Sequence, residues 1–166
     1  MKNFALPYFE QLQLDSLEKY YSTKIELNGT TVRLDLNFED KTAALSTMKS
    51  VKKIIDDIPR LDKQNKVYID NDFNDENGDT VRFYLEHHLE VADKQELSTL
   101  IDFNDKGTEP EKQLLAKLHL IRIGLYPNND ENFAVFDYSL GESFTNYLVV
   151  INLNIKGKLD YMTMES

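Results

Sequence analysis

The sequence lacks cysteine and long apolar runs. With no cysteine among 166 residues, disulfides, thiolate catalysis and cysteine-based zinc sites are excluded. This absence fits a reducing cytosol, and we expect a cytoplasmic protein. No stretch approaches the roughly 18 apolar residues of a membrane-spanning helix, and Met1 to Pro7 contain no apolar run long enough for a signal peptide.

Glycine is also scarce, and its six residues are scattered singly. The sequence therefore contains neither a Walker loop nor a dinucleotide fingerprint, because both need several glycines at fixed spacing. Gly141-Glu142-Ser143 is not the five-residue turn that carries a nucleophilic serine. Carboxylates are abundant, but nothing selects two of them for a glycosidase-type pair. We predict no catalytic residue, no cofactor and no metal site as the first interpretation.

Basic residues are few relative to acidic ones, 19 against 29, which gives a formal net charge of −10. Phosphate binding needs a basic stripe, so nucleic acid is not expected as the main ligand. An anionic membrane surface is disfavoured for the same reason. A protein of this charge either binds basic partners or simply remains soluble.

The negative charge is concentrated in residues 56–105, where fourteen acids face five bases. Within this part, five carboxylates fall in ten residues, and we call them the acidic segment: Asp70, Asp72, Asp75, Glu76 and Asp79. Like charges this close repel one another unless a basic partner or a cation offsets them. We predict that these residues contact a basic protein partner. The alternative is a solvated loop between helices, rich in Asp and Asn for turn and capping reasons.

The same stretch allows a calcium loop as an alternative. Asp75, Asn77, Asp79 and Glu86 occupy positions one, three, five and twelve of an EF-hand pattern. Position six is Thr80, whereas the pattern needs glycine there, and Gly78 stands at position four. The sharp turn of a calcium loop is therefore not encoded.

A second alternative is a hydrolase that uses His87 and His88 with nearby carboxylates. Adjacent residues point about 100° apart on a helix, so the two histidines cannot easily share a metal. His88 shares a predicted helix side with Val81, Tyr84, Leu85 and Leu89. We therefore predict that His88 is a packed, hydrogen-bonded histidine.

Hydrophobic periodicity predicts a single α+β domain over residues 1–166. A β-hairpin is expected at residues 20–38, because alternating apolar residues flank Asn28-Gly29, a strong two-residue turn signal. A further strand is expected at 4–9. The last third of the chain predicts an antiparallel β-meander with strands at 118–126, 133–139, 147–155 and 159–164.

The middle of the chain has helical spacing instead. Helices are expected from Leu45 to Pro59, over 60–73, from about Asp79, from Asp93 to about Ile101, and after Thr108 with Pro110 in the first turn. Asp93 with Glu96, and Thr108 with Glu111, read as capping boxes. Strands, then helices, then strands predict helices packed against one face of a mostly antiparallel sheet.

Several segments together resemble an uncharacterised bacterial family, the domain of unknown function numbered two-thousand-and-four. The matching stretches are residues 14–21, Gly78 to Val81, Glu86 to Leu89, Arg122 to Pro127, Phe133 to Tyr138 and Leu159 to Ser166. The resemblance spans nearly the whole chain but brings no established activity and no binding residues. It implies a candidate immunity protein of a bacterial toxin system.

Both lines of reasoning lead to one expectation. A toxin that attacks nucleic acid must be basic to hold phosphates, and an acidic inhibitor gains association rate and affinity against it. We therefore expect a non-enzymatic cytosolic binding protein, with a basic protein as partner. The sequence does not give the oligomeric state.

Overall fold

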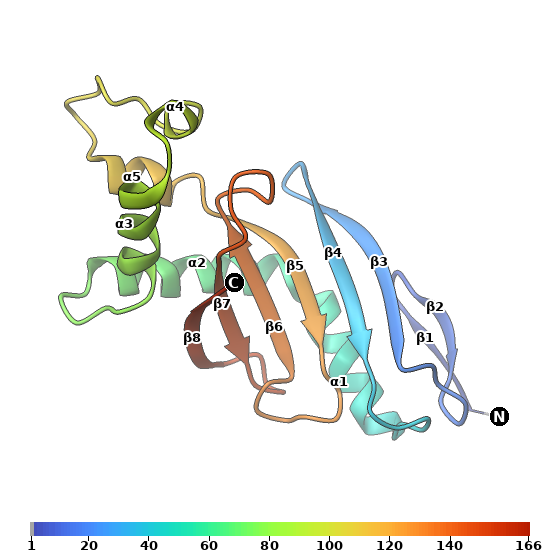
Figure 1. Cartoon of the computed structure of the whole chain (residues 1–166). Helices are drawn as coiled ribbons and strands as arrows, with labels where there is room; N and C mark the ends of the chain where they lie inside the picture. Colours follow the sequence, from blue (N-terminus) through green and yellow to red (C-terminus); the bar gives the residue numbers. More distant parts are fainter. Residues whose placement is uncertain (1) are drawn as a thin grey trace.

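A six-stranded sheet forms the centre of the molecule (Figure 1). In the computed structural model, which describes residues 2–166, its spatial order is β3-β4-β5-β6-β7-β8. All neighbouring strands run antiparallel except β4 and β5, which are parallel. The strands are β3 (Tyr20–Leu27), β4 (Thr30–Asn37), β5 (His119–Leu125), β6 (Ala134–Ser139), β7 (Leu148–Leu153) and β8 (Leu159–Glu165). A separate hairpin pairs β1 (Asn3–Leu6) with β2 (Glu10–Gln13).

The tight turn between β3 and β4 is the one that its sequence predicts. Asn28 and Gly29 both have positive φ, 52° and 78°, as the two central residues of a type I′ hairpin turn require. β4 then pairs in parallel with β5. Parallel neighbours need a crossover connection, and here the crossover holds all the helices of the described residues.

The helices are α1 (Leu45–Asp56), α2 (Ile58–Asn74), α3 (Val81–Val91), α4 (Lys94–Leu97) and α5 (Pro110–Leu115). Figure 1 shows α1 and α2 behind the sheet. It places α3, α4 and α5 together at one end of the molecule, and the β1–β2 hairpin at the other. None of these helices combines the length and apolar content needed to cross a bilayer.

The core lies between the sheet and the helices. Inward-facing side chains of the four central strands are almost completely buried there, including Leu34, Ile123, Phe136 and Ile151. Side chains at alternate positions face the opposite side of a sheet. That opposite side, which no helix covers in Figure 1, is called the open face below.

The α+β fold predicted from the sequence is confirmed, with its hairpin, its central helices and its C-terminal meander. Four details are wrong. The helix expected to run to about Ile101 ends at Leu97. The segment at 4–9 is the first strand of a hairpin and turns after Leu6. Pro59 lies in the first turn of α2, after α1 has already ended at Asp56. Glu109, and not Thr108, is the N-cap residue of α5.

Candidate functional site: a polar cavity on the open face of the sheet

A β-bulge in β5 aims one arginine at the open face. Leu120 pairs with Tyr138, but Arg122 pairs with Asp137, so Ile121 is an extra residue in β5. A bulge changes the phase of alternation and can redirect a side chain. As a result Leu120 and Ile123 both face the core, while Arg122 lies on the open face.

Arg122 is held on both sides by buried carboxylates. Its Nε and Nη2 donate to Asp35 at 2.8 and 2.9 Å, and its Nη1 donates to Asp137 at 3.1 Å. Nη2 also donates to the hydroxyl of Tyr126 at 2.9 Å. Burial alone would lower the pKa of Arg122, but the bonds to Asp35 and Tyr126 raise it above its ordinary value. The guanidinium is therefore permanently charged and fixed in place.

Gly124 leaves room for this arrangement. A Cβ atom at that position would lie 2.5 Å from Nη2 of Arg122, which is inside van der Waals contact. The arginine can therefore lie along its own strand and reach both Asp35 on β4 and Tyr126 beyond the end of β5.

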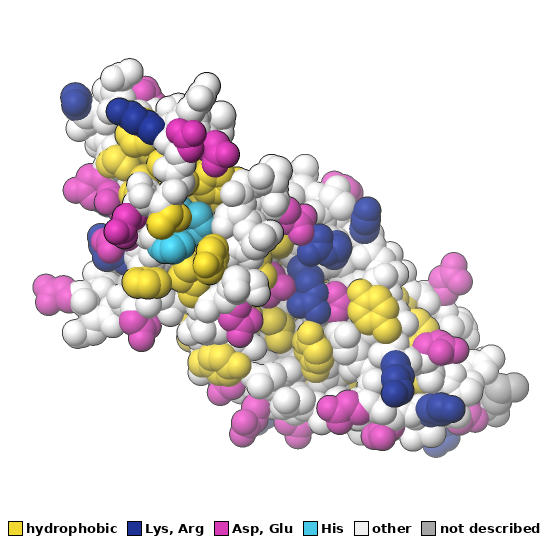
Figure 2. Space-filling view, in the orientation of Figure 1, with side chains coloured by type: hydrophobic (Ala, Val, Ile, Leu, Met, Phe, Trp, Pro, Cys, Tyr) yellow, Lys and Arg dark blue, Asp and Glu magenta, His cyan; other side chains and the backbone are white. Residues whose placement is uncertain are grey.

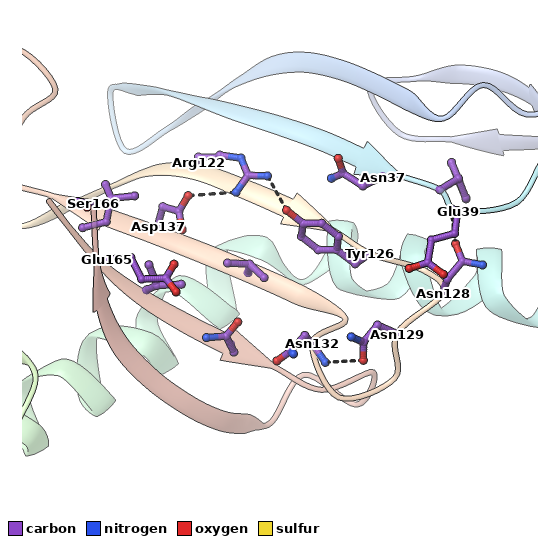
Figure 3. A pocket seen from close by; sticks show the side chains of 15 residues that line it. Asn37, Glu39, Arg122, Tyr126, Asn128, Asn129, Asn132, Asp137, Glu165 and Ser166 are labelled. Atoms are coloured by element: carbon purple, nitrogen blue, oxygen red, sulfur yellow. Dashed lines mark hydrogen bonds and ion pairs between the residues drawn. The ribbon is translucent and has the colours of Figure 1, made fainter. Parts of the chain in front are cut away.

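A cavity of about 570 Å³ opens beside Arg122 (Figure 3). This volume is within the range of small-molecule and side-chain binding pockets. The floor is formed by open-face residues of five strands, and the β5–β6 loop closes one end. The lining residues are Asn37, Phe38, Glu39, Arg122, Tyr126, Asn128, Asn129, Asn132, Val135, Asp137, Leu148, Val150, Asn152, Glu165 and Ser166.

Two side-chain amide atoms in this lining, one on Asn132 and one on Asn152, lack a hydrogen-bond partner within residues 2–166. Asn152 is only 4% exposed, yet no group in residues 2–166 accepts from its Nδ2. The buried Oδ1 of Asn132 likewise has no donor within the described chain. Buried polar atoms in native structures are almost always paired. Because both atoms lie in one cavity, water or a bound group can supply their missing partners there.

The cavity is also electrostatically unbalanced. Glu39, Asp137 and Glu165 line it, against the single positive charge of Arg122. Asp35, just behind the lining, already takes two hydrogen bonds from that arginine. Burial raises the pKa of Asp137 above its ordinary value, Arg122 opposes this, and the nearby charges of Glu165 and Asp35 raise it further. An additional cation in the cavity would relieve this repulsion.

The acidic segment predicted as the binding site lies elsewhere and is divided. Asp72, Asp75 and Asp79 line a shallow hollow with Tyr68 and residues of β8. Asp70 lines a different hollow, beside Lys66 and α5, and Glu76 is exposed in the loop after α2. The structure thus brings three of the five carboxylates together.

Two of these carboxylates have roles within the fold. Asp72 accepts the backbone N–H groups of Val81 at 2.7 Å and Thr80 at 3.3 Å, so it caps the first turn of α3 from a different helix. Asp75 accepts the N–H of Asn77 at 3.0 Å within the loop. A negative charge at a helix N-terminus is favourable. Turn and capping chemistry therefore accounts for part of the acidic segment.

We expect Asp72→Ala to lower the free energy of unfolding by about 1–2 kcal/mol, because α3 loses its cap and a favourable charge at its N-terminus. Chemical denaturation monitored by circular dichroism would measure this. Asp70→Ala is the matched control on the same helix, and it should change stability by less than about 0.5 kcal/mol. Equal effects of the two substitutions would contradict the capping role.

The calcium alternative gains no support from the geometry. Within residues 2–166, no three His, Asp or Glu side chains approach closely enough to hold a metal ion. Gly78 serves the loop in another way, since a Cβ atom there would collide with the carbonyl oxygen of Asp72.

The two histidines of α3 face different surroundings. His88 is buried, and its ring nitrogens contact the carbonyl of Tyr84 at 2.7 Å and the hydroxyl of Thr145 at 2.8 Å. Burial lowers the pKa of His88 below its ordinary value, which favours the neutral ring. The predicted packed, hydrogen-bonded role of His88 is confirmed. His87 instead stacks on Phe83 and contacts Tyr147, with ring centroids at 6.4 and 5.0 Å, and neither histidine lines the open-face cavity.

One pattern in the sequence points to the buried charges of the open face. Three strands place a charged residue between two apolar ones: Leu34-Asp35-Leu36, Ile121-Arg122-Ile123 and Phe136-Asp137-Tyr138. Charged residues are almost never fully buried unless they are paired, so this pattern could have suggested an ion cluster across neighbouring strands. Comparisons of the chain with protein-family models, with curated proteins and with solved structures found no match.

Proposed function

We propose that this protein binds a basic protein partner on the open face of its sheet. The observation that carries the proposal is the cavity beside Arg122, which combines unbalanced carboxylates with two buried amide atoms that lack hydrogen-bond partners. An acidic concave site of this kind attracts cations and repels phosphates. The partner is thus the basic protein expected from the sequence, but the centre of contact is the cavity and not the acidic segment.

Exposed aromatic side chains near the cavity support a protein as the partner. Phe83 and Tyr147 are 59% and 39% exposed and flank His87. Figure 2 shows histidine with hydrophobic side chains around it on the same side of the molecule as the open face. Tyr147 directly precedes Leu148, which lines the cavity. Aromatic anchors beside a polar site are typical of protein interfaces.

The acidic segment contributes at longer range in this proposal. Its exposed carboxylates add to the net charge of −10, which raises the rate of encounter with a basic protein. The resemblance to the uncharacterised bacterial family extends the proposal to toxin immunity, with a basic toxin as the partner. Neither His87 nor His88 lines the cavity, so the hydrolase alternative has no support from this site.

The experiment compares two charge reversals on the same strand. Glu165 lines the cavity, whereas Asp160 is exposed on β8 outside it. The wild-type chain, immobilised at low salt, should capture a basic protein from the native host. Glu165→Lys should weaken that binding at least tenfold through faster dissociation, and Asp160→Lys should leave it nearly unchanged.

A second set of measurements tests the long-range contribution of the acidic segment through its dependence on salt. Reversal of Asp70, Asp75 and Glu76 to Lys should mainly slow association, and the effect should fade as salt rises. Asp72 is left intact because it caps α3. Equal loss with Glu165→Lys and Asp160→Lys would contradict a specific role of the cavity, and binding that is insensitive to salt would contradict a basic partner.

A further inference from the structure

The unpartnered groups of the cavity specify the chemistry of what enters it. The Oδ1 of Asn132 requires a donor, whereas the Nδ2 of Asn152 requires an acceptor. The carboxylate of Glu165 forms no ion pair within residues 2–166, and it lies close enough to Asp137 to raise the pKa of that group. A single occupant that satisfies all of these groups carries positive charge, several donors and at least one acceptor.

A bare cation does not meet these requirements, because it offers Asn152 no acceptor. A phosphate or carboxylate ligand would face three lining carboxylates with only Arg122 to offset them. An arginine within a peptide meets all of them. Its guanidinium has five donors in a planar arrangement and no acceptor, while the carbonyl groups of the peptide supply acceptors.

We propose, as a consequence of the function proposed above, that the cavity binds one arginine side chain of an extended segment of the partner. The guanidinium donates to Glu165 and to Oδ1 of Asn132, and a carbonyl of the same segment accepts from Nδ2 of Asn152. Leu148 and Val150 provide apolar surface for the methylene groups, because both lie on the cavity floor. Arg122 stays bound to Asp35 and acts as a fixed wall.

The geometry explains why Arg122 itself does not fill this role. Its guanidinium already donates to Asp35, Asp137 and Tyr126, so it has little capacity left for Asn132 or Glu165. It also positions Asp137, whose side chain lines the cavity next to Arg122 (Figure 3). Glu165 and the Oδ1 of Asn132 thus remain free to bind a second guanidinium.

The test uses a blocked pentapeptide, Gly-Gly-Arg-Gly-Gly, against the full-length chain. Its citrulline analogue is the matched control, since citrulline keeps the shape and loses the charge, and a lysine analogue tests the choice of guanidinium over ammonium. In ¹H–¹⁵N NMR titrations we expect millimolar affinity for the arginine peptide, with the largest shifts at the side-chain amides of Asn132 and Asn152. The citrulline peptide should bind at least tenfold more weakly.

Variants of the lining residues test whether the arginine peptide binds in the cavity. Glu165→Gln and Asn152→Ala should each weaken the arginine peptide about tenfold, which corresponds to about 1.4 kcal/mol, and Asp75→Asn should not change it. Equal binding of the citrulline or lysine peptide, shifts centred on residues 72–79, or no shifts at about 10 mM peptide would each overturn this inference. If Glu165→Lys still abolished capture of the partner in that case, the proposed function would stand and only the arginine assignment would fail.

Discussion

Replacing Arg122 by leucine is expected to lower the free energy of unfolding by about 3–5 kcal/mol, because it leaves two buried carboxylates without their cation. Asp35 and Asp137 are only 2% and 6% exposed, and both depend on the guanidinium for charge compensation. For a chain of this length the loss corresponds to a melting temperature lower by about 10 °C. Differential scanning calorimetry at pH 7 would measure it.

The control for this substitution lies on the neighbouring strand. Arg33 occupies the position in β4 that pairs with Arg122, but its partner is Glu142 and both side chains are about half exposed. Arg33→Leu should cost less than about 1 kcal/mol. A similar loss for both variants would show that the buried ion cluster has no special role.

The pH dependence gives an independent check of the Arg122 prediction. Burial already raises the pKa of Asp137, and without Arg122 the folded-state pKa should rise further above the unfolded value. The folded variant then binds more protons than the unfolded chain at mildly acidic pH. The difference in the free energy of unfolding between the wild type and the Arg122→Leu variant should therefore shrink as pH falls from 7 toward 5. A triple change, with Asp35→Asn and Asp137→Asn added to Arg122→Leu, should recover much of the loss at pH 7.

The helices and strands could be predicted from the sequence because the apolar residues of each element recur at one dominant spacing. The Asn28-Gly29 turn and the alternation around it define β3 and β4 locally, and the same holds for β6, β7 and β8. The parallel pairing of β4 with β5 could not be read in this way. The two strands are separated by the whole helical part of the chain, so their contact depends on tertiary packing rather than on a turn.

The cavity could not be predicted from strand alternation, because β5 has a bulge at Ile121. Strict alternation from Leu120 would place Arg122 on the core side, and only the extra residue turns it toward the open face. The acidic segment, in contrast, was conspicuous in the sequence for local reasons, since Asp72 and Asp75 satisfy backbone groups of a turn and a helix start. A dense cluster of charges in a sequence can therefore have a local structural cause, whereas the isolated charges within apolar strands correspond here to a buried ion cluster.

Tyr138 and Asp62 form a second buried polar pair on which stability is expected to depend strongly. The hydroxyl of Tyr138 donates to Oδ1 of Asp62 at 2.7 Å in the core between β6 and α2. Asp62 is 2% exposed, and its remaining ionic partner is the half-exposed Lys66 at 3.3 Å. Tyr138→Phe removes the donor and leaves the carboxylate underbonded, which should cost about 2–3 kcal/mol in the free energy of unfolding.

Urea denaturation at pH 7 would measure this loss, and the double variant Tyr138→Phe/Asp62→Leu should recover part of it, because removing both polar partners is less costly than removing one. Tyr21→Phe is the control, since the Tyr21 hydroxyl only accepts a backbone N–H near the surface.

The dependence of stability on alkaline pH provides a second measurement of the same pair. Burial and the charge of Asp62 raise the pKa of Tyr138 well above 10, so above that pH the unfolded chain releases a proton that the folded chain retains. Wild-type stability should therefore fall as pH rises beyond about 10, and the gap to Tyr138→Phe should narrow; a gap that stays constant would contradict the buried pair.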